Sequence, residues 1–161
     1  MIRYISIGIS IVLLIGLTLT GVGFAQDRFT DNGDGTITDH ELGLMWAKTD
    51  NHGDISWHQA EKWVRFTFPY TLPTVYENWR LPTLMELQSL VVQGEGYETT
   101  CGQWVKIAPH IQLSCGWIWT SESGQLGPTA IVFNYNNVYH YSVRKIQNRA
   151  YRALPVRSLE E

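Results

Sequence analysis

The chain has 161 residues, a formal net charge of −3 and 44% hydrophobic residues, including seven tryptophans. This length suits one domain with a sizeable core, and neither an internal repeat nor a low-complexity segment is present. Because the charge balance is slightly acidic, we expect no nucleic-acid partner.

Residues 1–25 carry the pattern of a signal peptide. Arg3 precedes a nearly unbroken apolar run over residues 4–19, and small residues flank Phe24 before a cleavage site between Ala25 and Gln26. We expect residues 26–161 to form a single secreted or periplasmic domain. The alternative is an uncleaved N-terminal membrane anchor, since the apolar run is long. No second apolar segment approaches membrane-spanning length.

Charge is unevenly distributed after this segment. Acidic residues gather between residues 27 and 61, whereas bases dominate the C-terminal third. These bases are Arg144, Lys145, Arg149, Arg152 and Arg157. A patch of one sign can steer an oppositely charged ligand. The alternative is a set of scattered, solvated bases, some of them paired with the acidic half.

The two cysteines, Cys101 and Cys115, predict a disulfide, because an isolated pair in an exported chain usually closes one. The loop between them is short, so the bond would contribute about 3 kcal/mol. A redox pair or a metal site is the alternative, but the spacing fits neither a CxxC motif nor a zinc ribbon. We therefore expect no metal and no cofactor.

Residues 28–39 predict a β-hairpin, because Asn-Gly and Asp-Gly steps supply the positive φ that a tight turn needs. The acidic turn can also be compared with the calcium-binding loop of an EF-hand. The residues that would match positions of that pattern are Asn32, Asp34, Gly35 and Glu41. Thr30 would then take the first ligand position, so a turn is favoured. A buried strand over residues 42–46 and a polar loop over residues 49–54 follow.

Two helices are predicted from the capping motifs at their N-termini. Ser56 and Gln59 form a capping box for a helix over residues 56–66, and Pro69 and Pro73 mark an irregular connection over residues 68–78. Thr83 and Glu86 form a second capping box, for a helix running from residue 83 to about residue 93.

The second helix follows Pro82, which keeps Leu81 out of the helical region. Its apolar stripe consists of Leu84, Leu87, Leu90 and Val91. Gly94 is suited to ending it.

The rest of the chain predicts strands. The cysteine-bearing loop spans residues 95–114, an aromatic strand spans residues 116–120, and a hairpin joins residues 130–135 to 138–143 around Asn136 and Asn137. The last strand spans residues 151–157, where Pro155 indicates an edge or a bulge. This order of elements predicts an α+β fold with an antiparallel sheet.

The combination of these segments resembles one family. Residues 28–39 are followed by Gly43-Leu44-Met45-Trp46, then Trp79-Arg80-Leu81-Pro82-Thr83, Trp119-Thr120-Ser121 and a closing Pro155-Val156-Arg157. The chain thus resembles the Lcl C-terminal domain, the C-terminal domain family of the Legionella collagen-like adhesin, which is grouped with C-type-lectin-like folds. The resemblance covers nearly all of residues 28–157.

The resemblance implies a bacterial, lectin-like α+β domain with two helices, a twisted antiparallel sheet, and N- and C-terminal strands brought together. It also implies glycan binding, since the adhesin's domain is associated with sulfated glycosaminoglycans. The chain departs from the adhesin in having no collagen-like stalk. It also lacks the Glu-Pro-Asn, Gln-Pro-Asp and Trp-Asn-Asp motifs through which C-type lectins hold a sugar by calcium.

We expect no enzymatic activity. No Gly-x-Ser-x-Gly elbow is present, and no nucleophile–base arrangement stands out. Formylglycine-generating enzymes share the wider lectin-like fold and use reactive cysteines, so an enzyme of that kind would need a free thiol. Cys101 and Cys115 are expected to be structural instead.

Candidate ligand-binding residues lie between residues 119 and 145. Aromatic faces stack on sugar C–H groups, amides bond hydroxyls, and arginine holds sulfate or carboxylate by two bonds. The candidates are Trp119, Glu122, Asn134, Tyr135, Asn136, Tyr139, His140, Tyr141, Arg144 and Lys145. Strand alternation allows only about half of them to be exposed on one face. The alternative is that the tyrosines cover the core and the Asn pair is only a turn.

The sequence therefore predicts an exported lectin-like module that binds a carbohydrate or an anionic polysaccharide through its C-terminal bases. The alternative is a structural or protein-interaction module of the cell envelope that has no glycan ligand.

Overall fold

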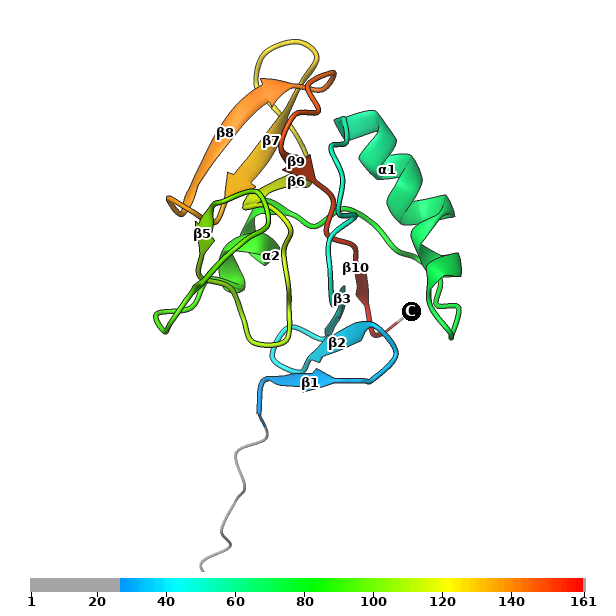
Figure 1. Ribbon diagram of the computed structural model, residues 1–161. Coiled ribbons are helices and arrows are strands. Elements are labelled where there is room, and N and C mark those ends of the chain that lie inside the picture. The colour runs from blue at the N-terminus through cyan, green and yellow to red at the C-terminus, as the bar shows by residue number, and fades with distance from the viewer. Residues whose placement is uncertain (1–26, 161) are drawn as a thin grey trace, which may run out of the picture.

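The computed structural model describes residues 27–160, so the predicted signal peptide and its cleavage site lie outside the described residues (Figure 1). The fold is α+β, as predicted. Two four-stranded sheets, a two-stranded ribbon, two α-helices and one short 3-10 helix make up the described part of the chain. The predicted purely antiparallel arrangement is corrected at one strand, as described below.

The first sheet has the order β1-β2-β3-β10 and is antiparallel throughout. Its strands are β1 (Phe29–Asp31), β2 (Thr36–Asp39), β3 (Leu44–Ala47) and β10 (Val156–Ser158). The hairpin predicted over residues 28–39 is β1 and β2. Because β10 pairs with β3, strands from both ends of the described chain share one sheet, as the family resemblance implied.

The acidic turn between β1 and β2 is held by its own hydrogen bonds. Gly33 and Gly35 have φ of 75° and 91°, the left-handed values that the turn prediction required. One oxygen of Asp34 accepts from the Thr36 amide at 3.0 Å, and the other accepts from the Tyr76 hydroxyl at 2.7 Å. A carboxylate oxygen of Asp31 accepts from the Lys48 ammonium at 2.6 Å. The turn carboxylates are thus engaged within the protein.

The second sheet has the order β8-β7-β6-β9. Its strands are β6 (Trp117–Ser123), β7 (Thr129–Asn134), β8 (Tyr139–Arg144) and β9 (Tyr151–Arg152). The hairpin predicted around Asn136 and Asn137 is confirmed by the β7–β8 pairing. Strand β9 lies parallel to β6, and residues 145–150 connect it to β8.

The prediction of one continuous strand over residues 151–157 is wrong. The chain leaves the second sheet after Arg152 and enters the first at Val156. Between them, Ala153, Leu154 and Pro155 are buried between the sheets. Pro155 has no N–H to continue a ladder, and its carbonyl instead accepts from the Ala47 amide at 2.9 Å.

Helix α1 (Trp57–Phe66) starts at the predicted capping box of Ser56 and Gln59 and is followed by the 3-10 helix η1 (Phe68–Thr71). Trp57, Ala60 and Val64 form the buried side of α1. They contribute to a cluster with Trp119 and Val132, so α1 covers part of one face of the second sheet.

Helix α2 (Leu84–Ser89) begins at the predicted capping box but is shorter than predicted. The Leu90 amide bonds the Leu87 carbonyl, three residues back, and the Leu90 carbonyl accepts from Ala108 at 2.7 Å. Val91 forms a β-bridge with Ile107. The helix therefore ends at Ser89, because a neighbouring segment takes the next backbone groups. The predicted apolar stripe is correct, since Leu87 and Leu90 are fully buried and Leu84 and Val91 pack against the same core.

The predicted cysteine loop contains a two-stranded ribbon of β4 (Tyr97–Glu98) and β5 (Trp104–Val105). The predicted disulfide between Cys101 and Cys115 is confirmed, with a Cα–Cα distance of 5.3 Å. The disulfide ties the ribbon to the residue that precedes β6 by two positions. No helix within residues 27–160 is both long and apolar enough to cross a membrane.

Candidate functional site

Three predicted ligand residues lie in the interior. Trp119, Asn134 and Tyr135 are exposed by only 0%, 3% and 1%. The Trp119 indole donates to the Ile55 carbonyl at 2.9 Å, and the Tyr135 hydroxyl donates to the Leu87 carbonyl at 2.7 Å. The Asn134 side chain accepts from the Asn136 amide at 2.8 Å and so shapes the turn. These three side chains stabilise the fold and do not face solvent.

Two further predicted residues, Glu122 and Lys145, are engaged with helix starts. Glu122 accepts from the Leu84 amide at 2.8 Å, which satisfies a free donor at the first turn of α2. The Lys145 ammonium lies 3.8 Å from the centre of the Trp57 ring, a cation–π contact at the start of α1. It also donates to the Ser123 hydroxyl at 3.2 Å.

Strand β8 divides most of the remaining predicted residues between two faces. Tyr139 is paired with Asn134 and Tyr141 with Val132, so both tyrosines lie on the face that α1 partly covers. His140 is paired with Phe133 and Arg144 with Thr129, which assigns both positions to the opposite face of the strand. The His140 ring nevertheless stacks on Tyr139, with ring centres 5.1 Å apart. The predicted residues therefore do not all meet in one surface. Asn136 is exposed in the turn, where its side-chain amide donates to the Trp104 carbonyl at 3.0 Å.

Tyr139 and Tyr141 belong instead to a row of aromatic rings across three strands. The Tyr139 ring centre lies 5.3 Å from that of Tyr141, which lies 5.3 Å from that of Trp117. Trp117 lies 5.9 Å from Tyr151, its partner in the parallel β6–β9 pair. We call Tyr139, Tyr141, Trp117 and Tyr151 the aromatic row.

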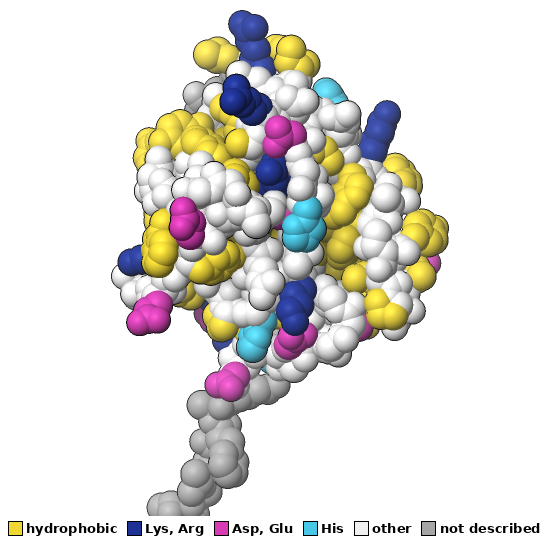
Figure 2. Space-filling view, viewed as in Figure 1, with side chains coloured by type: hydrophobic (Ala, Val, Ile, Leu, Met, Phe, Trp, Pro, Cys, Tyr) yellow, Lys and Arg dark blue, Asp and Glu magenta, His cyan; other side chains and the backbone are white. Residues whose placement is uncertain are grey.

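The aromatic row is accessible to solvent beyond the part of the sheet that α1 covers. Tyr139 is 57% exposed and Tyr141 is 37% exposed, while Trp117 and Tyr151 are half-buried. Figure 2 shows a group of hydrophobic side chains over the region of β8, at the upper left. Neighbouring rings within the row are inclined by 48° to 87°, so the surface is stepped and not flat.

Polar groups border the aromatic row. The Asn137 side chain donates to the Tyr141 hydroxyl at 2.7 Å, and the Tyr151 hydroxyl donates to the Gln147 side chain at 3.4 Å. A hollow of about 220 Å³ next to Tyr151 is lined by Gln147, Asn148 and Arg149. Burial raises the pKa of Tyr151, so its phenol stays neutral and able to donate near neutral pH. The row and its border together offer apolar faces beside amide and guanidinium donors.

The C-terminal bases do not form a continuous patch. Arg152 is buried and donates to Ser114 at 2.8 Å and to Asp54 at 2.7 Å. Arg157 donates to the Glu77 carbonyl at 2.8 Å. On the face shown in Figure 2, Lys and Arg side chains are scattered singly. Arg149 is the base that borders the aromatic row.

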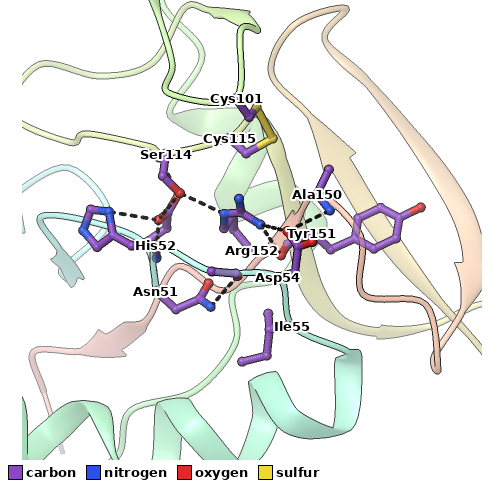
Figure 3. A network of polar contacts seen from close by, with 12 residues as sticks. Asn51, His52, Asp54, Ile55, Cys101, Ser114, Cys115, Ala150, Tyr151 and Arg152 are labelled. Carbon is purple, nitrogen blue, oxygen red and sulfur yellow. Dashed lines mark hydrogen bonds and ion pairs between the residues drawn. A yellow bond between two sulfur atoms is a disulfide. The ribbon is translucent and has the colours of Figure 1, made fainter.

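The contacts of Arg152 with Ser114 and Asp54 belong to a larger polar network (Figure 3). The Ser114 hydroxyl donates to Asp50 at 2.8 Å, and the His52 imidazole lies 3.9 Å from the same carboxylate. Asp50 therefore stands between the serine and the histidine, whereas a serine nucleophile needs the histidine next to it. The hydrogen bonds from Arg152 and the Ala150 amide lower the pKa of Asp54. The geometry is that of a structural network.

Trp117 and Tyr151 are the members of the row that the sequence analysis missed. One signal was available, because Trp117 and Trp119, like Tyr139 and Tyr141, are two residues apart and so share a face of a strand. Within residues 27–160, no group of three or more His, Cys, Asp or Glu side chains is placed to hold a metal ion.

Comparison with protein families matches residues 35–157 to the Lcl C-terminal domain. A search of curated proteins finds no match. The family match covers most of the chain, and this adhesin-associated domain indicates a binding or cell-envelope role. The disulfide is consistent with an oxidising compartment outside the cytoplasm.

Proposed function

The chain belongs to the Lcl C-terminal domain family, and from this premise we propose that it is an exported, non-catalytic module that binds a carbohydrate on the aromatic row. The observation that carries the proposal is the clustering of Tyr139, Tyr141, Trp117 and Tyr151 at 5.3–5.9 Å with two of the rings well exposed. Aromatic rings present an apolar body with a polar tip, which matches the mixed C–H and hydroxyl surface of a sugar.

The border of the row supplies the directional contacts of the proposed site. Side chains of Asn137 and Gln147 already bond tyrosine hydroxyls and have further donors and acceptors for sugar hydroxyls. Arg149 can hold a carboxylate or sulfate group by two hydrogen bonds. The other C-terminal bases are dispersed or engaged within the protein. Ring stacking is therefore proposed to supply most of the binding free energy, and charge a smaller part.

Binding of the chain beginning at Gln26 to immobilised heparin and chitin tests this proposal. The assay is run at low and high salt, with calcium and with chelator. We expect binding that survives high salt and chelator, because burial of apolar surface is not screened by ions. A polysaccharide held only by charge would be released by salt.

The Tyr141→Ala variant tests the site itself. We expect it to weaken binding about tenfold, which corresponds to about 1.4 kcal/mol and is of the size that one stacked ring contributes. Tyr70→Ala is the matched control, since Tyr70 is an exposed tyrosine on η1, outside the row. Equal effects of the two substitutions would refute the assignment of the row.

A module of the cell envelope that binds only a protein partner is the competing function. Exposed tyrosine and tryptophan are also enriched in protein interfaces. Absence of binding to every polysaccharide tested, together with capture of an envelope protein that is lost in Tyr141→Ala, would favour this alternative.

A further inference from the structure

Another exposed aromatic side chain lies in the β4–β5 ribbon. Trp104 in β5 is 52% exposed, while the next residue, Val105, is fully buried. Because side chains alternate along a strand, the burial of Val105 directs Trp104 outward. The outward indole offers a large apolar face together with a polar N–H group.

The surroundings of Trp104 form a wide depression of about 800 Å³. Its lining combines the indole with the side chains of Gln93, Glu95 and Lys106. Gly96 allows this arrangement, because a Cβ there would lie 2.3 Å from the Val105 carbonyl oxygen and 2.6 Å from the Trp104 indole nitrogen. The loop can lie against β5 only with glycine at this position. An indole face, an amide, a carboxylate and an ammonium group thus surround one open space.

The turn between β7 and β8 connects this depression to the aromatic row. Asn136 in that turn donates to the Trp104 carbonyl at 3.0 Å, and Tyr139 follows three residues later. Figure 2 shows hydrophobic side chains over β5, at the left, below the group over β8 and on the same face of the molecule. The two aromatic surfaces are therefore neighbours separated by a polar turn.

We infer that the Trp104 depression is a second subsite for the same sugar chain that the aromatic row binds, so the ligand is a linear oligosaccharide spanning both. This inference rests on the proposed function. The stepped rings of the row favour a single flexible chain over a flat polymer surface. When two subsites are filled by one chain, the second contact is intramolecular and raises the affinity of long chains only.

A length series tests the inference. Disaccharide, tetrasaccharide and octasaccharide fragments of chitin and of heparin are titrated calorimetrically into the wild-type chain and into Trp104→Ala. We expect the octasaccharide of the binding series to bind the wild type at least tenfold more tightly than the disaccharide. Trp104→Ala is expected to remove this gain and to leave the affinity of the disaccharide for the aromatic row within about twofold, since the two subsites act independently on short ligands.

Two further variants sharpen the outcome. Trp104→Phe keeps an aromatic face and is expected to retain part of the length gain. Leu126→Ala removes another highly exposed apolar side chain and is expected to change nothing. Thermal unfolding of each variant confirms that it is folded before it is compared.

The results separate the inference from the proposed function. Binding that depends on Tyr141 but shows no length gain, or a gain that Trp104→Ala leaves intact, overturns the second subsite alone. Failure of every fragment and polysaccharide to bind overturns the proposed function, and the second subsite falls with it.

Discussion

Glu86 carries several roles in one side chain. Its carboxylate accepts from both terminal nitrogens of Arg80, at 2.8 Å and 2.7 Å, and from the Thr83 amide at 2.7 Å. Burial alone would raise the pKa of Glu86, but the hydrogen bonds from Arg80 and Thr83 outweigh it and lower the pKa. The charged form is therefore favoured in the folded state, and folding favours loss of the proton.

The sign of this shift gives a pH prediction. A lowered folded pKa contributes stability above the ordinary value of 4.5, and that stability is lost as the pH falls through the folded pKa. We expect Glu86→Gln to lower the free energy of unfolding near neutral pH by about 1.5–3 kcal/mol, the range for hydrogen bonds to a charged group. Glutamine still suits a capping box, so the helix start is kept.

Urea unfolding between neutral pH and about pH 3 measures the effect, because the gap between wild type and variant should close as the carboxylate is protonated. Glu77→Gln, at an exposed position, is the control and should change the free energy of unfolding near neutral pH by no more than about 0.5 kcal/mol. A gap that stays constant down to acidic pH would contradict this account of Glu86.

At the scale of elements, the sequence predicted the first residues of the helices better than their last residues. Capping boxes are local, so Ser56 with Gln59 and Thr83 with Glu86 located the starts of α1 and α2. The end of α2 is set by Ala108 and Ile107, which take the backbone groups of Leu90 and Val91. Such contacts between distant segments leave no mark within the helix sequence.

The candidate site was predictable to a similar extent. Tyr139 and Tyr141 were proposed as ligand residues from the sequence of their predicted strand. Trp117 and Tyr151, in contrast, meet only because β9 lies parallel to β6. The predicted strand over residues 151–157 hid this contact, since one continuous strand would belong to a single sheet. Burial of Trp119, Asn134 and Tyr135 likewise follows from packing of both faces of the second sheet.

The disulfide gives a prediction for the β4–β5 ribbon. Joining Cys101 and Cys115, which are 14 positions apart, restricts the unfolded chain, so the paired Cys101→Ser and Cys115→Ser substitutions should cost about 3 kcal/mol. Urea titration of the double variant measures the loss. The wild type in reductant should show the same lowered midpoint. If neither treatment moves the midpoint, the disulfide does not stabilise the fold.

At the scale of the whole molecule, one buried network joins three distant segments. Asp50, which follows β3, accepts from the amide and the hydroxyl of Ser114 at 2.7 Å and 2.8 Å. The Ser114 hydroxyl accepts from Arg152 in β9 at 2.8 Å, and Arg152 continues to Asp54. Arg152 is also the last residue before the chain crosses from the second sheet to the first. The network therefore couples the disulfide loop to the crossing point of both sheets.

Asp50→Asn tests this coupling, because the amide nitrogen that replaces one carboxylate oxygen cannot accept from the Ser114 or His52 donors. We expect the free energy of unfolding to fall by about 1.5–3 kcal/mol. His52→Asn is the matched control. It removes an exposed imidazole 3.9 Å from Asp50, and asparagine tolerates the positive φ of 54° at that position. The control should change stability by no more than about 0.5 kcal/mol.

The manner of unfolding separates coupling from a local effect. Far-ultraviolet circular dichroism follows both sheets, while tryptophan fluorescence follows rings that include Trp46 in the first sheet and Trp119 in the second. If the network couples the sheets, both signals of Asp50→Asn shift together to a lower urea midpoint in one transition. Two separated transitions, with only one shifted, would show that Asp50 stabilises one sheet alone. The crossing of the chain at Ala153, Leu154 and Pro155, buried between the sheets, is the physical reason to expect a single transition.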